Sequence, residues 1–319
     1  MTLPPLRSLG YPLKLLVSAG ILLFLLSRID LVEVLHEFGG MQPSLAVAAM
    51  ALLAATHAVN ALKLGVLLPE RRVGSLFAYT LIAQAYALLL PGQIAGEAVK
   101  AYRLSRGNGA EAGGVVSAVV FDKLVGGFAI LLLSLIGLLT EPTRFGGGGA
   151  VWATAAALGI LLLSVAALAV RPVQTVLLRL FRGDADGWRG WIGRHLSRFL
   201  ESWRAQAMQP RTVALCLAYG VLSQTLTVGG CVLFGMGLGI DLGYAIWCVI
   251  IGMLTVVLLA PLTIGGLGLR EISLVGMLGH FGVAPDRALA LSLAIFAFQI
   301  MVAMLGIAVD LLVLRERRA

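Results

Sequence analysis

Charged residues are scarce in this chain. Asp, Glu, Lys and Arg make up 13% of its 319 residues, whereas hydrophobic residues make up 59%. A soluble globular domain is about one quarter charged, so this composition excludes a soluble protein and predicts an all-α polytopic membrane protein. The net charge of +8 does not indicate a nucleic-acid partner. The basic residues lie beside apolar runs, where they favour cytoplasmic orientation and contact with anionic lipid.

Cysteine is scarce too, and motifs for metal or nucleotide binding are missing. The three cysteines, Cys216, Cys231 and Cys248, lie in apolar runs without metal-ligand spacing, which is typical of small core residues rather than of a disulfide framework. The four histidines form no ligand cluster, and no G-x-x-x-x-G-K-[ST] phosphate-binding loop occurs. We therefore expect no metal, no cofactor and no ATP-driven step.

Two apolar stretches are interrupted by proline, glycine and charge. Residues 258–274 read LLAPLTIGGLGLREISL, and residues 88–104 read LLLPGQIAGEAVKAYRL. Broken helix at membrane depth persists only where protein or a water-filled cavity surrounds it. Broken segments in corresponding halves of a chain point to a transport site at a repeat interface. Aligned without gaps, the two prolines coincide and Lys100 falls on Arg270. This match indicates either an inverted repeat or chance similarity between leucine-rich segments.

Apolar runs long enough to cross a bilayer flank both breaks. About twenty residues suffice for a transmembrane helix, and we expect about six full spans, at residues 9–27, 41–62, 115–140, 150–170, 212–238 and 288–312. If the chain simply crossed the membrane at each break, arginine-rich segments would lie outside, against the positive-inside rule. We therefore expect two re-entrant hairpins, one entering from each face, and cytoplasmic N- and C-termini.

The expected organisation is one integral membrane domain, residues 1–319. It comprises residues 1–170 with the hairpin near 88–104, a linker at residues 171–211, and residues 212–319 with the hairpin near 258–274. The linker carries eight arginines and an apolar stripe with Trp188, Trp191 and Trp203. This pattern predicts a cytoplasmic interfacial helix with tryptophans at headgroup level. Such a helix would act as a hinge between the halves or contact substrate directly.

One polar edge lies near the end of the 41–62 span. His57, Asn60 and Lys63 recur at three-residue spacing there, and Lys63 also begins the basic turn that we expect in the cytoplasm. The edge either hydrogen-bonds to neighbouring helices or lines a substrate path.

Charged residues follow both breaks directly. Glu97, Lys100 and Arg103 share a face of a short helix because they are three residues apart. A helix that starts after a Pro-Gly break presents unpaired N–H groups to an anion, and a lipid phosphate is the anion expected there. Asp122 and Lys123 add a third charge pair. The candidate substrate-binding residues are Gly96, Glu97, Lys100, Arg103, Asp122, Lys123, Gly265, Gly266, Arg270 and Glu271. Alternatively, the carboxylates neutralise the cations as buried structural pairs.

Three motifs carry a resemblance to a known family. In order, they are LLPGQIAGEAVKAYRL, VVFDKLVG and PLTIGGLGLRE. With this spacing the chain resembles the lysylphosphatidylglycerol synthase transmembrane region family, the flippase-like domain of the bacterial multiple peptide resistance factor, over about residues 15–314. The resemblance implies a flippase or scramblase that moves a polar or charged lipid between leaflets of the bacterial inner membrane, and not an enzyme. The partner would be an anionic or aminoacylated phospholipid, or a polyprenyl-phosphate lipid. An oligomer is compatible with the sequence.

Two other functions are considered alongside lipid movement. One is a membrane-embedded enzyme acting on a lipid-linked sugar, with Asp30 and Glu33 as loop carboxylates; the short outer loops argue against it. The other is an ion-coupled transporter of small solutes, which could use the same hairpin architecture. Lipid translocation is the leading interpretation.

Overall fold

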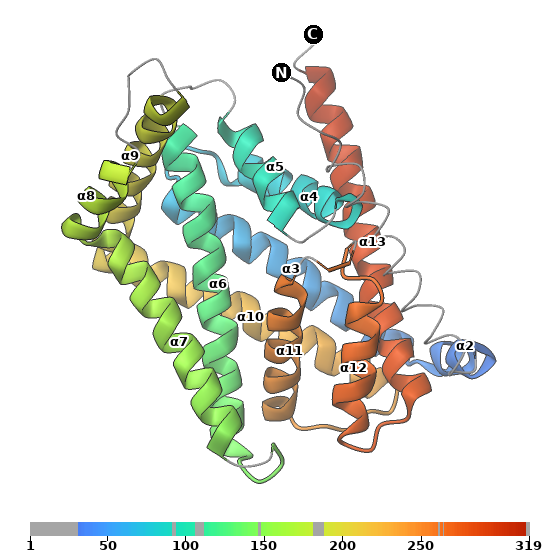
Figure 1. Ribbon diagram of the computed structural model, residues 1–319. Coiled ribbons are helices and arrows are strands. Elements are labelled where there is room, and N and C mark those ends of the chain that lie inside the picture. The colour runs from blue at the N-terminus through green and yellow to red at the C-terminus, as the bar shows by residue number, and fades with distance from the viewer. Residues whose placement is uncertain are drawn as a thin grey trace, which may run out of the picture. The chain divides into compact units, whose positions relative to one another are not determined.

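The structure is a computed structural model that describes residues 31–90, 94–105, 112–145, 148–180, 188–260, 262–263 and 265–316 (Figure 1). Every regular element in these ranges is an α-helix. The helices are α2 (Leu31–Gly40), α3 (Pro43–Leu67), α4 (Val73–Leu89), α5 (Ile94–Ser105), α6 (Ala112–Thr140), α7 (Gly148–Ala169), α8 (Arg171–Leu180), α9 (Trp188–Ala207), α10 (Pro210–Gly237), α11 (Tyr244–Leu259), α12 (Leu269–Gly279) and α13 (Pro285–Glu316). The expected span at residues 9–27 and the two break prolines, Pro91 and Pro261, lie outside the described residues.

Five helices are long and apolar enough to cross a membrane, and they confirm the all-α polytopic class. They cover Pro43–Leu67, Gly113–Thr140, Gly148–Ala169, Pro210–Gly237 and Pro285–Leu312, which match five of the six expected spans. At 1.5 Å per residue the shortest of them, with 22 residues, is about 33 Å long, which suffices for a hydrocarbon core of about 30 Å. α3, α10 and α13 each begin with proline, which is favoured at the first helical position because its missing N–H would have no partner there.

The first break is the tip of a helical hairpin formed by α4 and α5. A Cβ on Gly96 would lie 2.2 Å from the carbonyl oxygen of Ala83 and 2.8 Å from the Cβ of Ala87. In a continuous helix Ala87 and Gly96 would be about 13 Å apart along the axis. The chain therefore reverses after α4, and Gly96 allows α5 to pack directly on the backbone of α4.

The second break forms the hairpin of α11 and α12, which pack against each other (Figure 1). Gly265, Gly266 and Gly268 have φ angles of +60°, +79° and +83°, in the left-handed region that side chains disfavour. A Cβ on Gly266 would lie 3.1 Å from Leu258 on α11. The glycines seen in the sequence thus form the turn itself, and both expected breaks are helical hairpins.

The described chain forms two compact units that are discontinuous in sequence. Unit 1 comprises Met1–Ala55, Leu81–Glu97 and Leu226–Ala319, and unit 2 comprises Thr56–Thr80 and Ala98–Thr225. α3, α4, α5 and α10 contribute residues to both units. α7, α8, α9 and most of α5 belong to unit 2, whereas α2, α11, α12 and α13 belong to unit 1.

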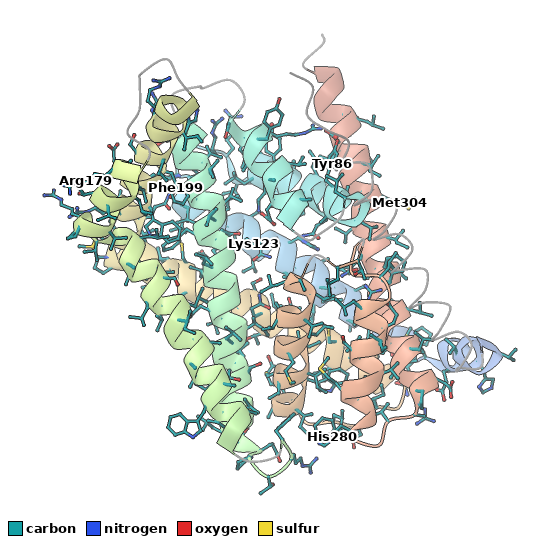
Figure 2. All side chains as sticks on the ribbon, in the orientation of Figure 1. Tyr86, Lys123, Arg179, Phe199, His280 and Met304 are labelled. Atoms are coloured by element: carbon teal, nitrogen blue, oxygen red, sulfur yellow. The ribbon has the colours of Figure 1, made fainter. Side chains whose placement is uncertain are left out.

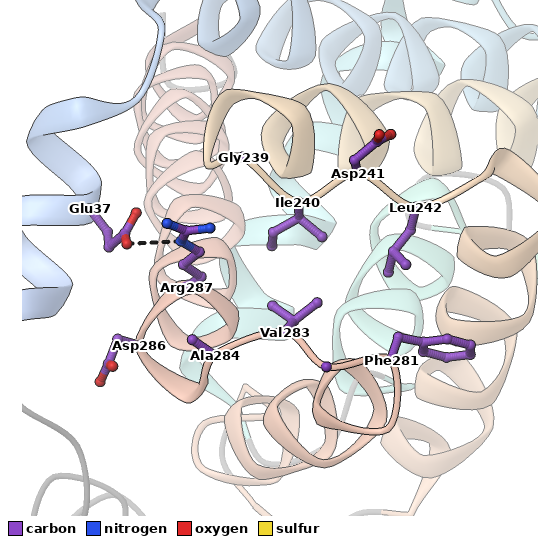
Figure 3. Close-up of a pocket in the computed structure, with 11 residues that line it drawn as sticks. Glu37, Gly239, Ile240, Asp241, Leu242, Phe281, Val283, Ala284, Asp286 and Arg287 are labelled. Carbon is purple, nitrogen blue, oxygen red and sulfur yellow. Dashed lines mark hydrogen bonds and ion pairs between the residues drawn. The ribbon is translucent and has the colours of Figure 1, made fainter.

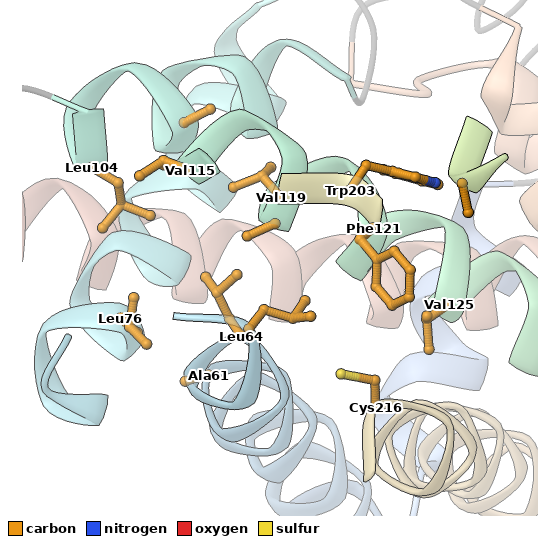
Figure 4. Packing of buried hydrophobic residues seen from close by; sticks show 14 residues of the cluster. Ala61, Leu64, Leu76, Leu104, Val115, Val119, Phe121, Val125, Trp203 and Cys216 are labelled. Atoms are coloured by element: carbon orange, nitrogen blue, oxygen red, sulfur yellow. The ribbon is translucent and has the colours of Figure 1, made fainter. Parts of the chain in front are cut away.

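Unit 2 has its apolar core around Trp203 of α9 (Figure 4). The Trp203 side chain is fully buried, its Nε1 donates to the carbonyl of Val165 at 3.1 Å, and Phe121 of α6 meets it edge-on with ring centroids 5.2 Å apart. α9 packs on α6 and α7. Protein rather than lipid therefore covers Trp203. The sequence did not show this, because an apolar stripe looks the same whether lipid or protein covers it. The side chains of Trp188 and Trp191 lie outside the described residues.

Unit 1 is held together by close helix approaches at glycine. A Cβ on Gly306 of α13 would lie 2.2 Å from the carbonyl oxygen of Leu81 on α4, and one on Gly235 of α10 would lie 2.5 Å from the ring of Trp247 on α11. α12 also packs on α13. The C-terminal part of α4 is therefore covered by α5 at Gly96 and by α13 at Gly306, with backbone contact at both glycines.

Candidate functional site

In unit 1, the charge pair after the second break caps the start of α12. The Glu271 Oε2 atom accepts a hydrogen bond from the backbone N–H of Gly268 at 2.6 Å. A carboxylate three residues into a helix satisfies an unpaired N–H and interacts favourably with the helix dipole. The anion position at this helix start is therefore filled by the protein's own Glu271.

Arg270 is enclosed by α13. Its Nε donates to the Ser292 hydroxyl at 3.0 Å and its Nη1 to the Gln299 side-chain oxygen at 2.8 Å. Its guanidinium also pairs with Glu271 and lies 4.9 Å above the ring of Phe296. Arg270 and Glu271 are 2% and 1% exposed. Charge and hydrogen bonds are thus balanced inside unit 1, the arrangement that a buried ion pair requires.

The two breaks meet in unit 1. A Cβ on Gly265 would lie 3.2 Å from the carbonyl oxygen of Leu88, at the end of α4, one residue after the Ala87 that packs on Gly96. Gly96 is buried and Glu97 is half-buried. Glycines from both hairpins therefore bring the backbone of the two breaks into contact.

In unit 2, a second buried ion pair joins α3 to α6. The Lys63 Nζ atom lies 3.2 Å from the Asp122 carboxylate and also donates to the Asp122 backbone oxygen at 3.2 Å. The two side chains are 3% and 7% exposed. Lys63 is therefore not part of a solvated basic turn, as the sequence suggested, but lies in the interior of unit 2.

Asp122 pairs with Lys63 and not with its neighbour Lys123, so the expected third pair is wrong in its partner. Asp122 is buried in the unit. Lys123 is exposed on α6 (Figure 2). Lys100 of α5 is buried and Arg103 is half-buried.

The polar edge of α3 forms interhelical hydrogen bonds. The Ser223 hydroxyl of α10 donates to the Asn60 side-chain oxygen at 2.9 Å, and the Gln224 amide donates to the Gly126 carbonyl oxygen of α6 at 3.3 Å. The first of the two alternatives for this edge is thus confirmed for Asn60 and Lys63.

The ten predicted site residues divide between the units. Gly96, Glu97, Gly265, Gly266, Arg270 and Glu271 belong to unit 1, and Lys100, Arg103, Asp122 and Lys123 belong to unit 2. The structure brings Arg270 together with Glu271, and it places Gly96 and Gly265 against neighbouring residues of α4, Ala87 and Leu88. Asp30 and the side chain of Glu33, considered as enzymatic carboxylates, lie outside the described residues.

Sequence reasoning missed several polar partners on α13. Ser292 and Gln299 are seven residues apart and so share one helical face with Phe296. Two polar residues at this spacing in an apolar span could have identified the face. It also missed Asp310, which is buried and accepts a hydrogen bond at 3.2 Å from the Tyr86 hydroxyl of α4. A lone carboxylate in an apolar helix was the available signal.

A separate pocket of about 480 Å³ opens in unit 1 at the loop after α10 and the loop before α13 (Figure 3). Its acidic side chains are Glu37, Asp241 and Asp286, and Arg287 pairs with Glu37 at 2.9 Å. None of the ten predicted site residues lines this pocket. Within the described ranges, no group of three or more His, Cys, Asp or Glu side chains could hold a metal ion.

Glycine-packed hairpins and ion pairs buried within apolar helices define a polytopic helical membrane protein with ionisable groups in its interior. The family described as the lysylphosphatidylglycerol synthase TM region matches residues 12–306, and the chain belongs to this family. This match confirms the resemblance seen in the three motifs. No curated protein and no solved structure gives a significant match to the chain.

Proposed function

We propose that this protein moves a phosphate-bearing lipid between the leaflets of the bacterial inner membrane, as a flippase or scramblase and not as a synthase. The observation that carries the proposal is the burial of ionisable residues inside apolar helices next to two broken hairpins, in a chain of a lipid-related membrane family. Intramembrane charges are costly and are a functional-site hypothesis by default.

The physical task of such a protein is to lower the cost of passing a polar headgroup through hydrocarbon. Charged and hydrogen-bonding groups lose several kcal/mol or more when they leave water without a partner. Broken hairpins offer backbone N–H and C=O groups at membrane depth, and buried Lys and Arg side chains offer counter-charges for a phosphate. The acyl chains can remain in lipid while the headgroup passes along the protein.

Lys100 and Arg270 are each a candidate for a phosphate contact within its own unit, because they occupy matching positions in the sequences of the two hairpins. Arg270 can take up a phosphate oxygen in place of Gln299 or Ser292, since both are neutral acceptors, without giving up its pair with Glu271. Lys100 is buried in unit 2, where the low dielectric constant makes the attraction between its ammonium and an anionic phosphate stronger than in water.

The arginine distribution supports cytoplasmic N- and C-termini for this transporter. Basic residues are frequent in α8, in α9 and after the last span, and the positive-inside rule places such segments in the cytoplasm. Headgroups would then enter from the cytoplasmic leaflet at the hairpin of α4 and α5.

The test is lipid movement in proteoliposomes that carry a trace of fluorescent phospholipid, with several headgroups compared. Wild-type protein should expose inner-leaflet label to an external quencher much faster than protein-free vesicles do. Lys100→Gln should lose about 1.5–3 kcal/mol of phosphate binding, or roughly a ten- to hundred-fold decrease in rate at limiting lipid, while its melting temperature stays near that of the wild type.

Arg144→Gln is the matched control, because the Arg144 side chain is 55% exposed and pairs with Glu141 after the end of α6. It should move lipid at the wild-type rate. Wild-type vesicles that expose label no faster than empty vesicles, for any headgroup, would rule out the proposed function. A folded Lys100→Gln protein with full activity would remove Lys100 from the site.

A further inference from the structure

The two buried ion pairs hold their carboxylates differently. Glu271 accepts hydrogen bonds from the Gly268 N–H at 2.6 Å and the Ser292 hydroxyl at 3.1 Å in addition to its pair with Arg270. Among the described residues, the Lys63 ammonium lies 3.2 Å from the Asp122 Oδ1 atom, and this oxygen accepts no hydrogen bond. Three groups therefore hold the Glu271 carboxylate, whereas the Asp122 Oδ1 atom has the Lys63 ammonium beside it and no hydrogen-bond donor.

The Lys63–Asp122 pair joins α3 directly to α6. Neutral hydrogen bonds join each of these helices to α10, from Ser223 to Asn60 and from Gln224 to Gly126. Replacing a buried ion pair by apolar residues of similar volume is often neutral or stabilising, so stability does not account for this one. Its depth adds to the cost, since Asp122 is nine residues into the span that begins at Gly113, or about 14 Å along the helix.

We propose that Asp122 is a proton-binding site that couples lipid movement to the proton gradient. A proton from water bonds to a carboxylate oxygen of Asp122, and the carboxylate loses its negative charge. The Lys63 ammonium loses its counter-charge but keeps its hydrogen bond to the Asp122 backbone oxygen at 3.2 Å, so it stays in place. The net charge of the pair changes from 0 to +1, which a phosphodiester of charge −1 can neutralise. The coupling rests on the proposed function and specifies one proton for each anionic lipid.

The charged and titratable groups around Asp122 come from several helices. They are Lys63 and His57 on α3, Lys123 on α6 itself and Cys216 on α10. α9 also packs on α6, but its Arg198 meets α6 at Gly113, about 14 Å along the helix from Asp122. α7 has no charged residue between Gly148 and Ala169. Asp122 is the carboxylate in this group, and His57 is the competing proton acceptor that the experiment must separate from it.

The main measurement uses sealed proteoliposomes with a fluorescent anionic phospholipid and a pH difference of one unit across the membrane. One proton coupled to one lipid can shift the steady-state leaflet ratio by at most about tenfold per pH unit, because each unit is worth about 1.4 kcal/mol per proton. Wild-type vesicles should approach this shift and lose it when a proton ionophore is added. Asp122→Asn should show no shift with the gradient, whereas His57→Gln and the exposed-carboxylate control Glu141→Gln should follow the gradient as the wild type does.

A second measurement detects the proton without lipid movement. Infrared difference spectra between neutral and acid pH should contain a band from a buried protonated carboxyl group that Asp122→Asn removes and Glu141→Gln retains. If Asp122→Asn does not fold, the double variant Lys63→Gln/Asp122→Asn takes its place in both experiments. Its two neutral side chains can still form a hydrogen bond with each other.

The outcomes separate the coupling from the proposed function. Wild-type vesicles that move lipid without responding to the pH gradient, or Asp122→Asn vesicles that still respond, would overturn the proton site and leave lipid translocation standing. If the wild type moves no lipid, the proposed function fails, and the infrared band alone tests whether Asp122 binds a proton. Loss of the band in Asp122→Asn then supports the proton site, and a band that persists there, or none in the wild type, refutes it.

Discussion

Gly96→Ala should strongly destabilise the hairpin of α4 and α5. The new methyl group would lie 2.2 Å from the Ala83 carbonyl oxygen and 2.8 Å from the Ala87 Cβ, whereas optimal separations are about 3.5 Å. α5 would have to move by about 1 Å against a packed backbone. Overpacking typically costs about 1–3 kcal/mol, and backbone contact places this case at or above the upper end. Alanine has a higher helix propensity than glycine, which stabilises the helix by up to about 1 kcal/mol. We therefore expect the free energy of unfolding to fall by at least about 2 kcal/mol.

Thermal unfolding of purified protein measures this loss, and the chain carries its own probe. All three cysteines are buried and free, so a fluorogenic thiol dye reports unfolding. The melting temperature of Gly96→Ala should fall by roughly 4–12 °C, at about 2–4 °C per kcal/mol. Gly276→Ala in α12 is the matched control, because a Cβ there meets nothing within 4 Å. It should melt at or slightly above the wild-type temperature. Equal melting of the two variants would refute the close packing of the hairpin.

Three further predictions concern ion pairing, packing and topology. Arg270→Gln should lose about 3–5 kcal/mol because it leaves a buried carboxylate unpaired; thermal unfolding that matches exposed Arg144→Gln would contradict the buried network. Trp203→Phe should lower stability by roughly 1–3 kcal/mol through a lost hydrogen bond and an unfilled space, whereas Trp152→Phe, at a 76% exposed side chain, should change little; equal effects would argue against a Trp203-centred core. A single cysteine at Asn108, in a variant without the native cysteines, should label from the cytoplasm, and labelling only from outside would reject the first re-entrant hairpin.

The helices and both hairpins could be predicted because their signals are local. Apolar runs of span length and a glycine cluster are properties of neighbouring residues. The structure has helices at these runs and a turn at the glycine cluster. The φ angles of Gly265, Gly266 and Gly268 give the physical reason for the second cluster. The sequence also indicated the Arg270–Glu271 pair, since its two members are adjacent.

The partners of the buried charges could not be predicted, because they depend on which helices meet. Lys63 and Asp122 are 59 residues apart, and nothing local distinguishes a lysine that pairs with a distant carboxylate from one that ends a span. Trp203 illustrates the same limit for apolar residues: periodicity identifies the covered face of α9, but the covering layer is α6 and α7 rather than lipid.

The separation of Lys63 from Asp122 also sets an order for membrane insertion. At about 5–20 residues per second, Asp122 is synthesised roughly 3–12 s after Lys63, whereas Arg270 and Glu271 are made together. During that interval α3 carries an uncompensated ammonium, which costs about 2.5–3.5 kcal/mol at the centre of a membrane helix. α3 ends at Leu67, four residues after Lys63, so the long side chain can reach the interface until α6 arrives. When α6 inserts beside α3, Lys63 can turn inward and pair with Asp122. The ion pair therefore forms only after the two helices have come together.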